Sequence, residues 1–148
     1  MTDAVAEIKT DLSLKFGEPK KPDIYEQEIV AMQRRILETD RPMYLPNTLI
    51  ADLVVPVLKE EKIIGFGFLF FREGYADEMH MVDPSEQSKG VGMELVKNLE
   101  EVGKERGANE IHSFIVDNRP QAQRAMELAG YTVQRKERGR ILYVKKLT

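Results

Sequence analysis

Two glycines in a short run suggest a binding site for a phosphate. The run Gln87–Gly92 lies between a strand-like stretch, 77–82, and a strongly helical one, 91–106. Free backbone N–H groups at the first turn of a helix attract anions, and the helix dipole adds to that attraction. Glycine lets the backbone approach a phosphate closely. The alternative interpretation is a turn that only links a strand to a helix.

The spacing of the glycines excludes the two best-known phosphate motifs. The run has no third glycine at the dinucleotide-binding spacing, and it lacks the Gly-Lys-Ser/Thr ending of a P-loop. Another class of phosphate ligand has to be sought in the elements around the run.

Hydrophobic periodicity predicts the order β-α-β-β-β-loop-α-β-α-β-β along the chain. The expected strands are 8–16, 50–58, 63–71, 75–82, 110–116, 131–134 and 141–146. The expected helices are 22–39, 91–106 and 121–129, with a further short helix conceivable at Pro42–Leu49. The short turns between the second, third and fourth strands favour an antiparallel meander.

Two motifs on these elements resemble those of the GCN5-related N-acetyltransferase (GNAT) family. The first is Val82-Asp83-Pro84 followed by Gln-x-x-Gly-x-Gly. The second is Asp117-Asn118, a helix, and then Gly130-Tyr131, about one residue longer than the usual spacing. The resemblance covers nearly the whole chain. It implies one domain, 1–148, of α/β (α+β) class, with a mixed, mostly antiparallel central sheet flanked by helices.

The resemblance also implies a site for acetyl-CoA as co-substrate. In that family the glycine loop holds the pyrophosphate, and the preceding strand pairs with the pantetheine arm. Carried over to this chain, the residues are Met81, Val82, Gln87, Ser88, Lys89, Gly90, Val91, Gly92 and Asn118. For Lys89, a solvated loop lysine is an equal alternative.

Glu78 and His80 are the candidates for proton transfer to and from the acceptor. Residues two apart on a strand share a face, so Glu78, His80 and Val82 point the same way, and Asp77 points to the opposite face. A lysine-like amine is mostly protonated at neutral pH and must lose a proton before it attacks. The alternatives are a solvent-facing Glu78 and a hydrogen-bonded core histidine at His80.

The general acid of the family has no counterpart in this chain. Many members carry a tyrosine four residues before the glycine of the second motif, where this chain has Met126. Tyr131 lies beyond the helix, and Tyr75 and Tyr44 are unsupported substitutes. Two functions therefore stay open: an acetyl-CoA-dependent N-acetyltransferase acting on a primary amine, and a non-catalytic CoA-binding or protein-interaction module.

Composition limits the remaining classes of function. The chain has no cysteine, two histidines and a net charge of −3, which disfavours disulfides, a metal site and nucleic acid as a partner. It has no transmembrane-length apolar run and no signal-peptide pattern, so a cytoplasmic protein is expected, with a homodimer possible. The basic cluster Arg135, Lys136, Arg138 and Arg140 is either a solvated hairpin tip or a contact for an acidic partner.

Overall fold

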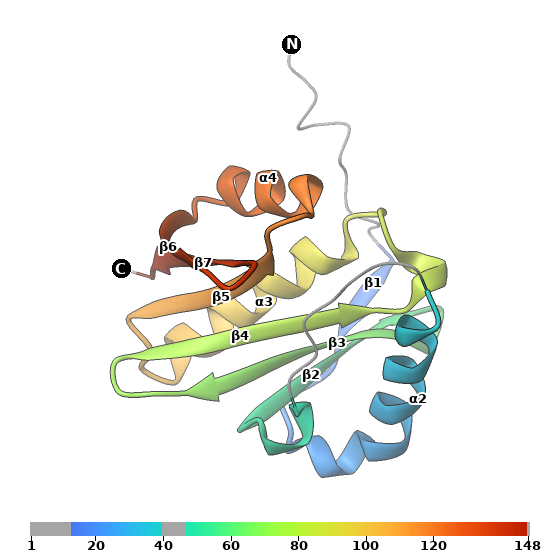
Figure 1. The fold of residues 1–148 in the computed structure, drawn as a ribbon. Coiled ribbons are helices and arrows are strands. Elements are labelled where there is room, and N and C mark those ends of the chain that lie inside the picture. Colours follow the sequence, from blue (N-terminus) through green and yellow to red (C-terminus); the bar gives the residue numbers. More distant parts are fainter. Residues whose placement is uncertain (1–12, 40–46, 148) are drawn as a thin grey trace.

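Alternating apolar residues fold into one seven-stranded sheet (Figure 1) in the computed structural model, which describes residues 13–39 and 47–147. The strands are β1 (Leu14–Phe16), β2 (Leu53–Lys59), β3 (Lys62–Phe71), β4 (Tyr75–Val82), β5 (Glu110–Val116), β6 (Thr132–Glu137) and β7 (Arg140–Lys146). Their spatial order is β1-β2-β3-β4-β5-β7-β6. The pairing of β4 with β5 is parallel and the other named pairings are antiparallel. The predicted mixed, mostly antiparallel sheet is confirmed.

Three α-helices and three short 3-10 helices complete the described fold. They are η1 (Pro22–Tyr25), α2 (Glu26–Leu37), η2 (Thr48–Ile50), η3 (Pro84–Glu86), α3 (Val91–Glu105) and α4 (Pro120–Leu128). Proline opens η1 and α4, where a missing N–H does no harm to the helix. The predicted element order is confirmed over the described residues.

The predicted boundaries were wrong at a few places. Ile50, expected in a strand, lies in η2 because the side chain of Asn47 caps that turn by accepting from the Leu49 N–H at 3.2 Å. The strand β6 continues to Glu137 because the hairpin to β7 turns in only two residues. Residues 8–12 of the expected first strand, and 42–46 of the conceivable helix, lie outside the described residues.

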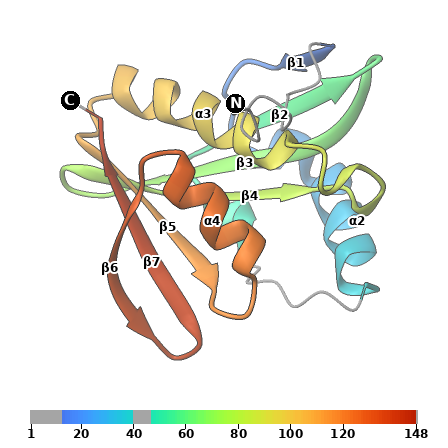
Figure 2. The same cartoon turned by 90° about the horizontal axis from the view of Figure 1, so that it is seen from above.

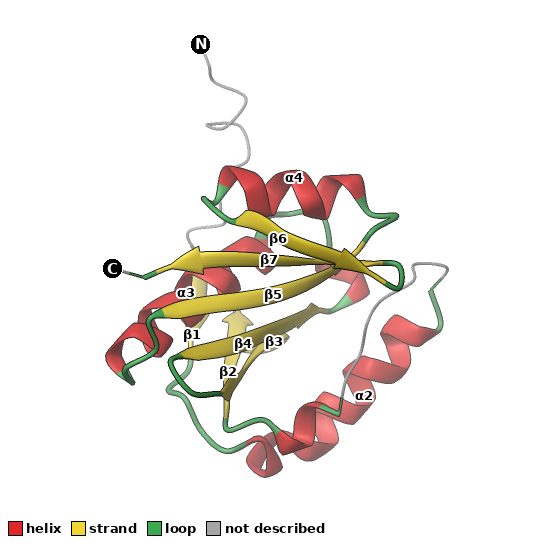
Figure 3. Ribbon diagram, turned by 60° about the vertical axis from the view of Figure 1, so that its left-hand side comes forward, coloured by secondary structure: helices red, strands yellow, loops and turns green. Residues whose placement is uncertain are grey.

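Successive residues of the strands serve two separate cores. One face of β2, β3 and β4 packs under α2, with Ile29, Met32 and Ile36 against Phe66 and Phe68. The opposite face packs under α3, whose residues Leu95 and Leu99 are fully buried. Figure 3 shows α2 and α3 on opposite sides of the sheet. This alternation places the side chains of Glu78 and His80 on the α3 side.

The sheet opens between its two parallel strands. β4 pairs with β5 only from Tyr75–Glu78 to Glu110–Ser113. Beyond those pairs β4 continues toward Val82 while β5 turns away, and Figure 2 shows the two strands diverging. The open end of this wedge lies beside the first turn of α3 and beside α4 (Figure 2).

Candidate active site

The predicted glycine loop folds into a concave turn at the start of α3. Ser88 and Gly90 both adopt the left-handed conformation, with φ of 67° and 85°. Gly90 is the N-cap of α3 and no side chain caps that end, so the backbone N–H groups of the first turn are left for a ligand. An anion is the ligand that these donors and the helix dipole favour.

Polar contacts hold the loop against the end of β4. The Gln87 Nε2 donates to the Val82 carbonyl at 3.2 Å. Asp83 accepts from the Ser85 backbone N–H and hydroxyl, and pairs with the Arg35 Nε at 2.6 Å. Burial raises the pKa of Asp83, but these hydrogen bonds and the Arg35 charge lower it by more, so it stays ionised at neutral pH. The loop is therefore fixed before any ligand arrives.

A cavity of about 560 Å³ lies between this loop and α4. Among the predicted residues its lining includes His80, Met81, Val82, Gln87, Ser88, Gly90, Val91 and Gly92. Neither Lys89 nor Asn118 lines it; Lys89 pairs with Glu86 at 3.5 Å, and Asn118 is exposed in the turn before α4. The α4 side of the cavity comes from residues such as Gln121, Ala125 and Met126.

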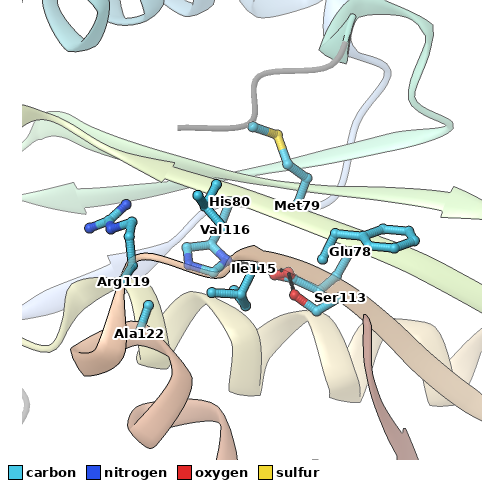
Figure 4. A pocket seen from close by; sticks show the side chains of 9 residues that line it. Glu78, Met79, His80, Ser113, Ile115, Val116, Arg119 and Ala122 are labelled. Atoms are coloured by element: carbon cyan, nitrogen blue, oxygen red, sulfur yellow. Dashed lines mark hydrogen bonds and ion pairs between the residues drawn. The ribbon is translucent and has the colours of Figure 1, made fainter. Parts of the chain in front are cut away.

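A second cavity, of about 120 Å³, occupies the wedge between β4 and β5 (Figure 4). Its lining residues are Glu78, Met79, His80, Ser113, Phe114, Ile115, Val116, Arg119 and Ala122. Because successive strand residues point to opposite faces, Glu78 and Ser113 come from the α3 side, and Met79 and Phe114 come from the other side. The cavity thus passes through the sheet. His80, Ile115, Arg119 and Ala122 line both cavities, so the two spaces meet beside His80.

Three polar side chains form a hydrogen-bonded chain in this wedge. The His80 Nδ1 lies 2.6 Å from the Glu78 Oε1, and the Ser113 hydroxyl donates to the Glu78 Oε2 at 3.2 Å. The Glu78 side chain is only 1% exposed, whereas that of His80 is 23% exposed. An ionised carboxylate only accepts, so Nδ1 carries the proton and Nε2 of the neutral ring is left as the base.

The environment of His80 favours its protonated form. Burial lowers the pKa of His80, but the charge and hydrogen bond of Glu78 raise it by more, and Arg119 opposes them only weakly. The net pKa lies above the ordinary value of 6.5. His80 is consequently a stronger base than a histidine in water.

Gly92 makes room for the imidazole as well as for an anion. A Cβ at Gly92 would lie 3.3 Å from both the Cδ2 and the Nε2 of His80. That separation is tighter than ordinary van der Waals contact, so a side chain there would press on the ring. The loop and the histidine are therefore packed as one unit.

The backbone of β4 presents a free-standing edge to the wedge. The Asp83 N–H donates to the Ile64 carbonyl at 2.8 Å, which fixes the alternation of the β3–β4 ladder. Met81 directs its N–H and C=O to β3, while His80 and Val82 direct theirs toward the side that β5 has left. A ligand with amide groups could add to this edge like a strand.

Comparison with known families identifies the fold and its group. The model of the "Acetyltransferase (GNAT) family" matches residues 18–131. The chain belongs to the GNAT family. The resemblance inferred from the two sequence motifs is thereby confirmed. Among curated proteins, no relative matches this GNAT chain.

Solved structures share the GNAT fold at low sequence identity. The PaiA N-acetyltransferase of Thermoplasma acidophilum, in complex with coenzyme A, is 15% identical with a TM-score of 0.73, covering 91% of this chain and 99% of that one. The yncA protein of Salmonella typhimurium, with its cofactor acetyl-CoA, is 16% identical with a TM-score of 0.69, covering 92% and 95%. The ribosomal-protein-S18-alanine N-acetyltransferase of Escherichia coli is 14% identical with a TM-score of 0.68, covering 91% and 94%.

Two residues of this GNAT site were missed by the sequence analysis. Ser113 is 2% exposed, and a polar residue inside the apolar run Ile111–Val116 was the signal that could have marked it. Arg119 stands next to the predicted Asn118, but nothing in the sequence showed that the turn directs this residue to the cavities. Its position depends on where β5 ends relative to α4.

The described tyrosines do not supply a hydroxyl at the place of Met126. Met126 is 1% exposed and its apolar side chain lines the larger cavity. The Tyr131 hydroxyl donates to Glu100 at 2.7 Å, and Tyr75 stacks on His112 at a centroid distance of 4.0 Å. Neither of these two tyrosines lines either cavity. Tyr44 lies outside the described residues.

Two further searches concern metal ions and membranes. Over residues 13–39 and 47–147, no group of three or more His, Cys, Asp or Glu side chains could hold a metal ion. Within the same part of the chain, none of the helices has both the length and the apolar character needed to span a bilayer.

Proposed function

We propose that this protein is an N-acetyltransferase that moves the acetyl group of acetyl-CoA to a primary amine by direct attack in a ternary complex. The observation that supports it most is the meeting of two cavities beside His80, one running to the glycine loop and one passing through the sheet. The PaiA and yncA structures, which contain coenzyme A and acetyl-CoA, have the same fold.

The larger cavity would hold the cofactor. The backbone N–H groups of Ser88, Gly90 and Gly92 would surround the pyrophosphate at the positive end of α3. The pantetheine amides would pair with the open edge of β4 at His80 and Val82. Lys89 would act only as a distant positive charge, and Asn118 would contact the cofactor only if the turn before α4 adjusts. No metal takes part in this proposal.

His80 would be the base and Glu78 would orient it. An ammonium acceptor loses one proton before it attacks, and the nitrogen loses a second as the tetrahedral intermediate collapses. The new C–N bond forms as the C–S bond breaks, one proton leaves with the coenzyme A thiol, and the other goes to solvent. The His80 Nε2 can accept the first of these protons because Glu78 keeps Nδ1 protonated.

The same imidazole would serve the leaving thiolate. Met126 offers no proton at the position where the family usually has a tyrosine. A protonated His80, standing where the two cavities meet, can return a proton to the sulfur. One residue would then act as base and acid in turn, with no covalent enzyme intermediate.

A binding module without catalysis is the competing function, and Met126 is the observation that favours it. The decisive test is a calorimetric titration with acetyl-CoA, with a nicotinamide dinucleotide as the control ligand, followed by an assay of thiol release with primary amines. Binding of the CoA ester with amine-dependent thiol release supports the enzyme. Binding without release supports the module, and no binding contradicts both.

The chain offers a matched control for the catalytic assignment. His112, like His80, contacts a glutamate two residues earlier, with its Nε2 at 2.9 Å from Glu110, but it lines neither cavity. We expect His80→Gln to lower turnover by about 100-fold or more, with acetyl-CoA affinity little changed. His112→Gln should leave both values near those of the parent protein. Equal turnover of the two variants would contradict the role of His80.

A further inference from the structure

The inference concerns the acceptor and rests on the proposed function. The face of the sheet opposite α3 and α4 is covered by α2 only over its first half. The core under α2 draws its described residues from α2, β2, β3, β4 and the segment before β2, and none from β5 or β7. On this face Phe114 lines the smaller cavity together with Met79 and Val116. Anything that reaches His80 from this side passes the ring of Phe114.

Two arginines of the β6–β7 hairpin lie over that ring. The Arg140 guanidinium carbon is 4.0 Å from the Phe114 ring centroid, and that of Arg135 is 5.9 Å away. The register explains the contact, because Val116 pairs with Arg140 and Phe114 with the buried Leu142. Cation–π contact of this kind holds a guanidinium in place while its N–H donors stay at the ring's edge.

The charge at this mouth is positive after its internal pairing is counted. One oxygen of Glu137 lies 3.1 Å from the Arg135 Nε and 3.9 Å from an Nη of Arg140. Each guanidinium carries five N–H donors, so one carboxylate shared by both leaves a surplus of donors. Arg119 lines the cavity itself, and the exposed Asp117 is the nearest further carboxylate in sequence. Three arginines thus face two carboxylates.

This charge is unfavourable for an acceptor that carries only positive charge. A free amine is mostly an ammonium ion near neutral pH, and arginines around the entrance would repel it. A carboxylate on the same molecule would remove the repulsion and find bidentate donors. The cavity of about 120 Å³ holds roughly four water-sized groups, so only a small end of the acceptor fits inside.

We propose that the acceptor is a small primary amine bearing a carboxylate, with the amine beside His80 and the carboxylate on Arg140 and Arg135. The hairpin arginines would select the substrate and take no part in the chemistry. Phe114 would hold Arg140 over the entrance and contact the carbon chain between the two polar ends.

The test compares matched acceptors at saturating acetyl-CoA. It uses 4-aminobutyrate, its amide 4-aminobutyramide, and the diamine putrescine. We expect kcat/KM to be at least about tenfold higher for the carboxylate than for the amide, and lowest for the diamine. Arg140→Gln should reduce that preference to near unity through KM. The control Arg138→Gln, at the exposed hairpin tip, should retain it.

A binding measurement separates this inference from the proposed function. The CoA complex is titrated with 4-acetamidobutyrate and with its amide, which need no turnover. Carboxylate binding that is lost in Arg140→Gln supports the acceptor site even if no amine is acetylated, and the proposed function alone then fails. Equal binding and equal kcat/KM for acid and amide, or a preference for putrescine, would overturn the carboxylate site.

Discussion

Glu78 acts at the scale of single residues as the group that sets the protonation of His80. It is buried, it receives a hydrogen bond from Ser113, and it raises the pKa of the imidazole. A base works when deprotonated, so activity should fall as the pH drops through this raised pKa. The acid limb of the pH profile should therefore have its midpoint above 6.5.

Replacing the charge while keeping the hydrogen-bond acceptor tests this relation. We expect Glu78→Gln to move the acid-limb midpoint of kcat/KM to lower pH, because the neutral amide no longer stabilises the imidazolium. Glu110→Gln, which alters the matching pair at His112, should leave the profile unchanged. The same midpoint in the parent and in Glu78→Gln would show that the titrating group is not His80.

The sequence could place Glu78 and His80 on one face because strand periodicity needs only local spacing. It could not show that Glu78 is buried and Ser113 bonded to it, since that contact joins residues 35 positions apart in the chain. The approach of Arg140 to Phe114 is of the same kind. Local patterns predict the element that carries a residue; which side chains from other elements meet it depends on register between strands.

At the scale of elements, the turn into α3 combines anion binding with the packing of His80. We expect Gly92→Ala to weaken acetyl-CoA binding by about tenfold, because its Cβ would shift either the ring of His80 or the first turn of the helix. Calorimetry measures the affinity. Turnover should fall further than affinity alone explains, since the base moves as well.

Gly103→Ala is the control for this change. It lies in the last turns of the same helix, and its Cβ would press on the Ile111 side chain at 3.1 Å, far along α3 from the loop. It should lower the melting temperature while acetyl-CoA affinity stays that of the parent protein. Loss of affinity in both variants would mean that helix stability, and not the loop, controls binding.

Elements were predicted well where periodicity is long and boundaries are marked by proline or glycine. The strands Tyr75–Val82 and Glu110–Val116 agree with the predicted ranges, and α3 differs by one residue at its end. The start of β2 was misplaced because the capping of η2 by Asn47 competes with strand propensity in the apolar run that follows. Side-chain capping is decided by a few atoms, which residue periodicity does not record.

The whole molecule is a wedge that is closed at one end. Near that end α3 joins the two halves of the sheet, since Glu100 accepts from the Tyr131 hydroxyl at 2.7 Å and pairs with Lys145 at 3.0 Å. At the other end β4 and β5 separate, and the proposed cofactor would bridge them. Binding there should therefore restrain strands on both sides of the opening as well as the loop.

Hydrogen exchange can test this bridging directly. At an acetyl-CoA concentration of 100 Kd the folded state gains about 2.7 kcal/mol, which corresponds to a melting-temperature rise of roughly 5–10 °C for a chain of this size. We expect slower amide exchange in 79–82 on β4 and in 114–116 on β5, with β1 and β2 unchanged. A nicotinamide dinucleotide at the same concentration should have no effect. Protection confined to 87–92 would mean that the ligand occupies the loop alone, and the wedge would then be no acetyl-transfer site.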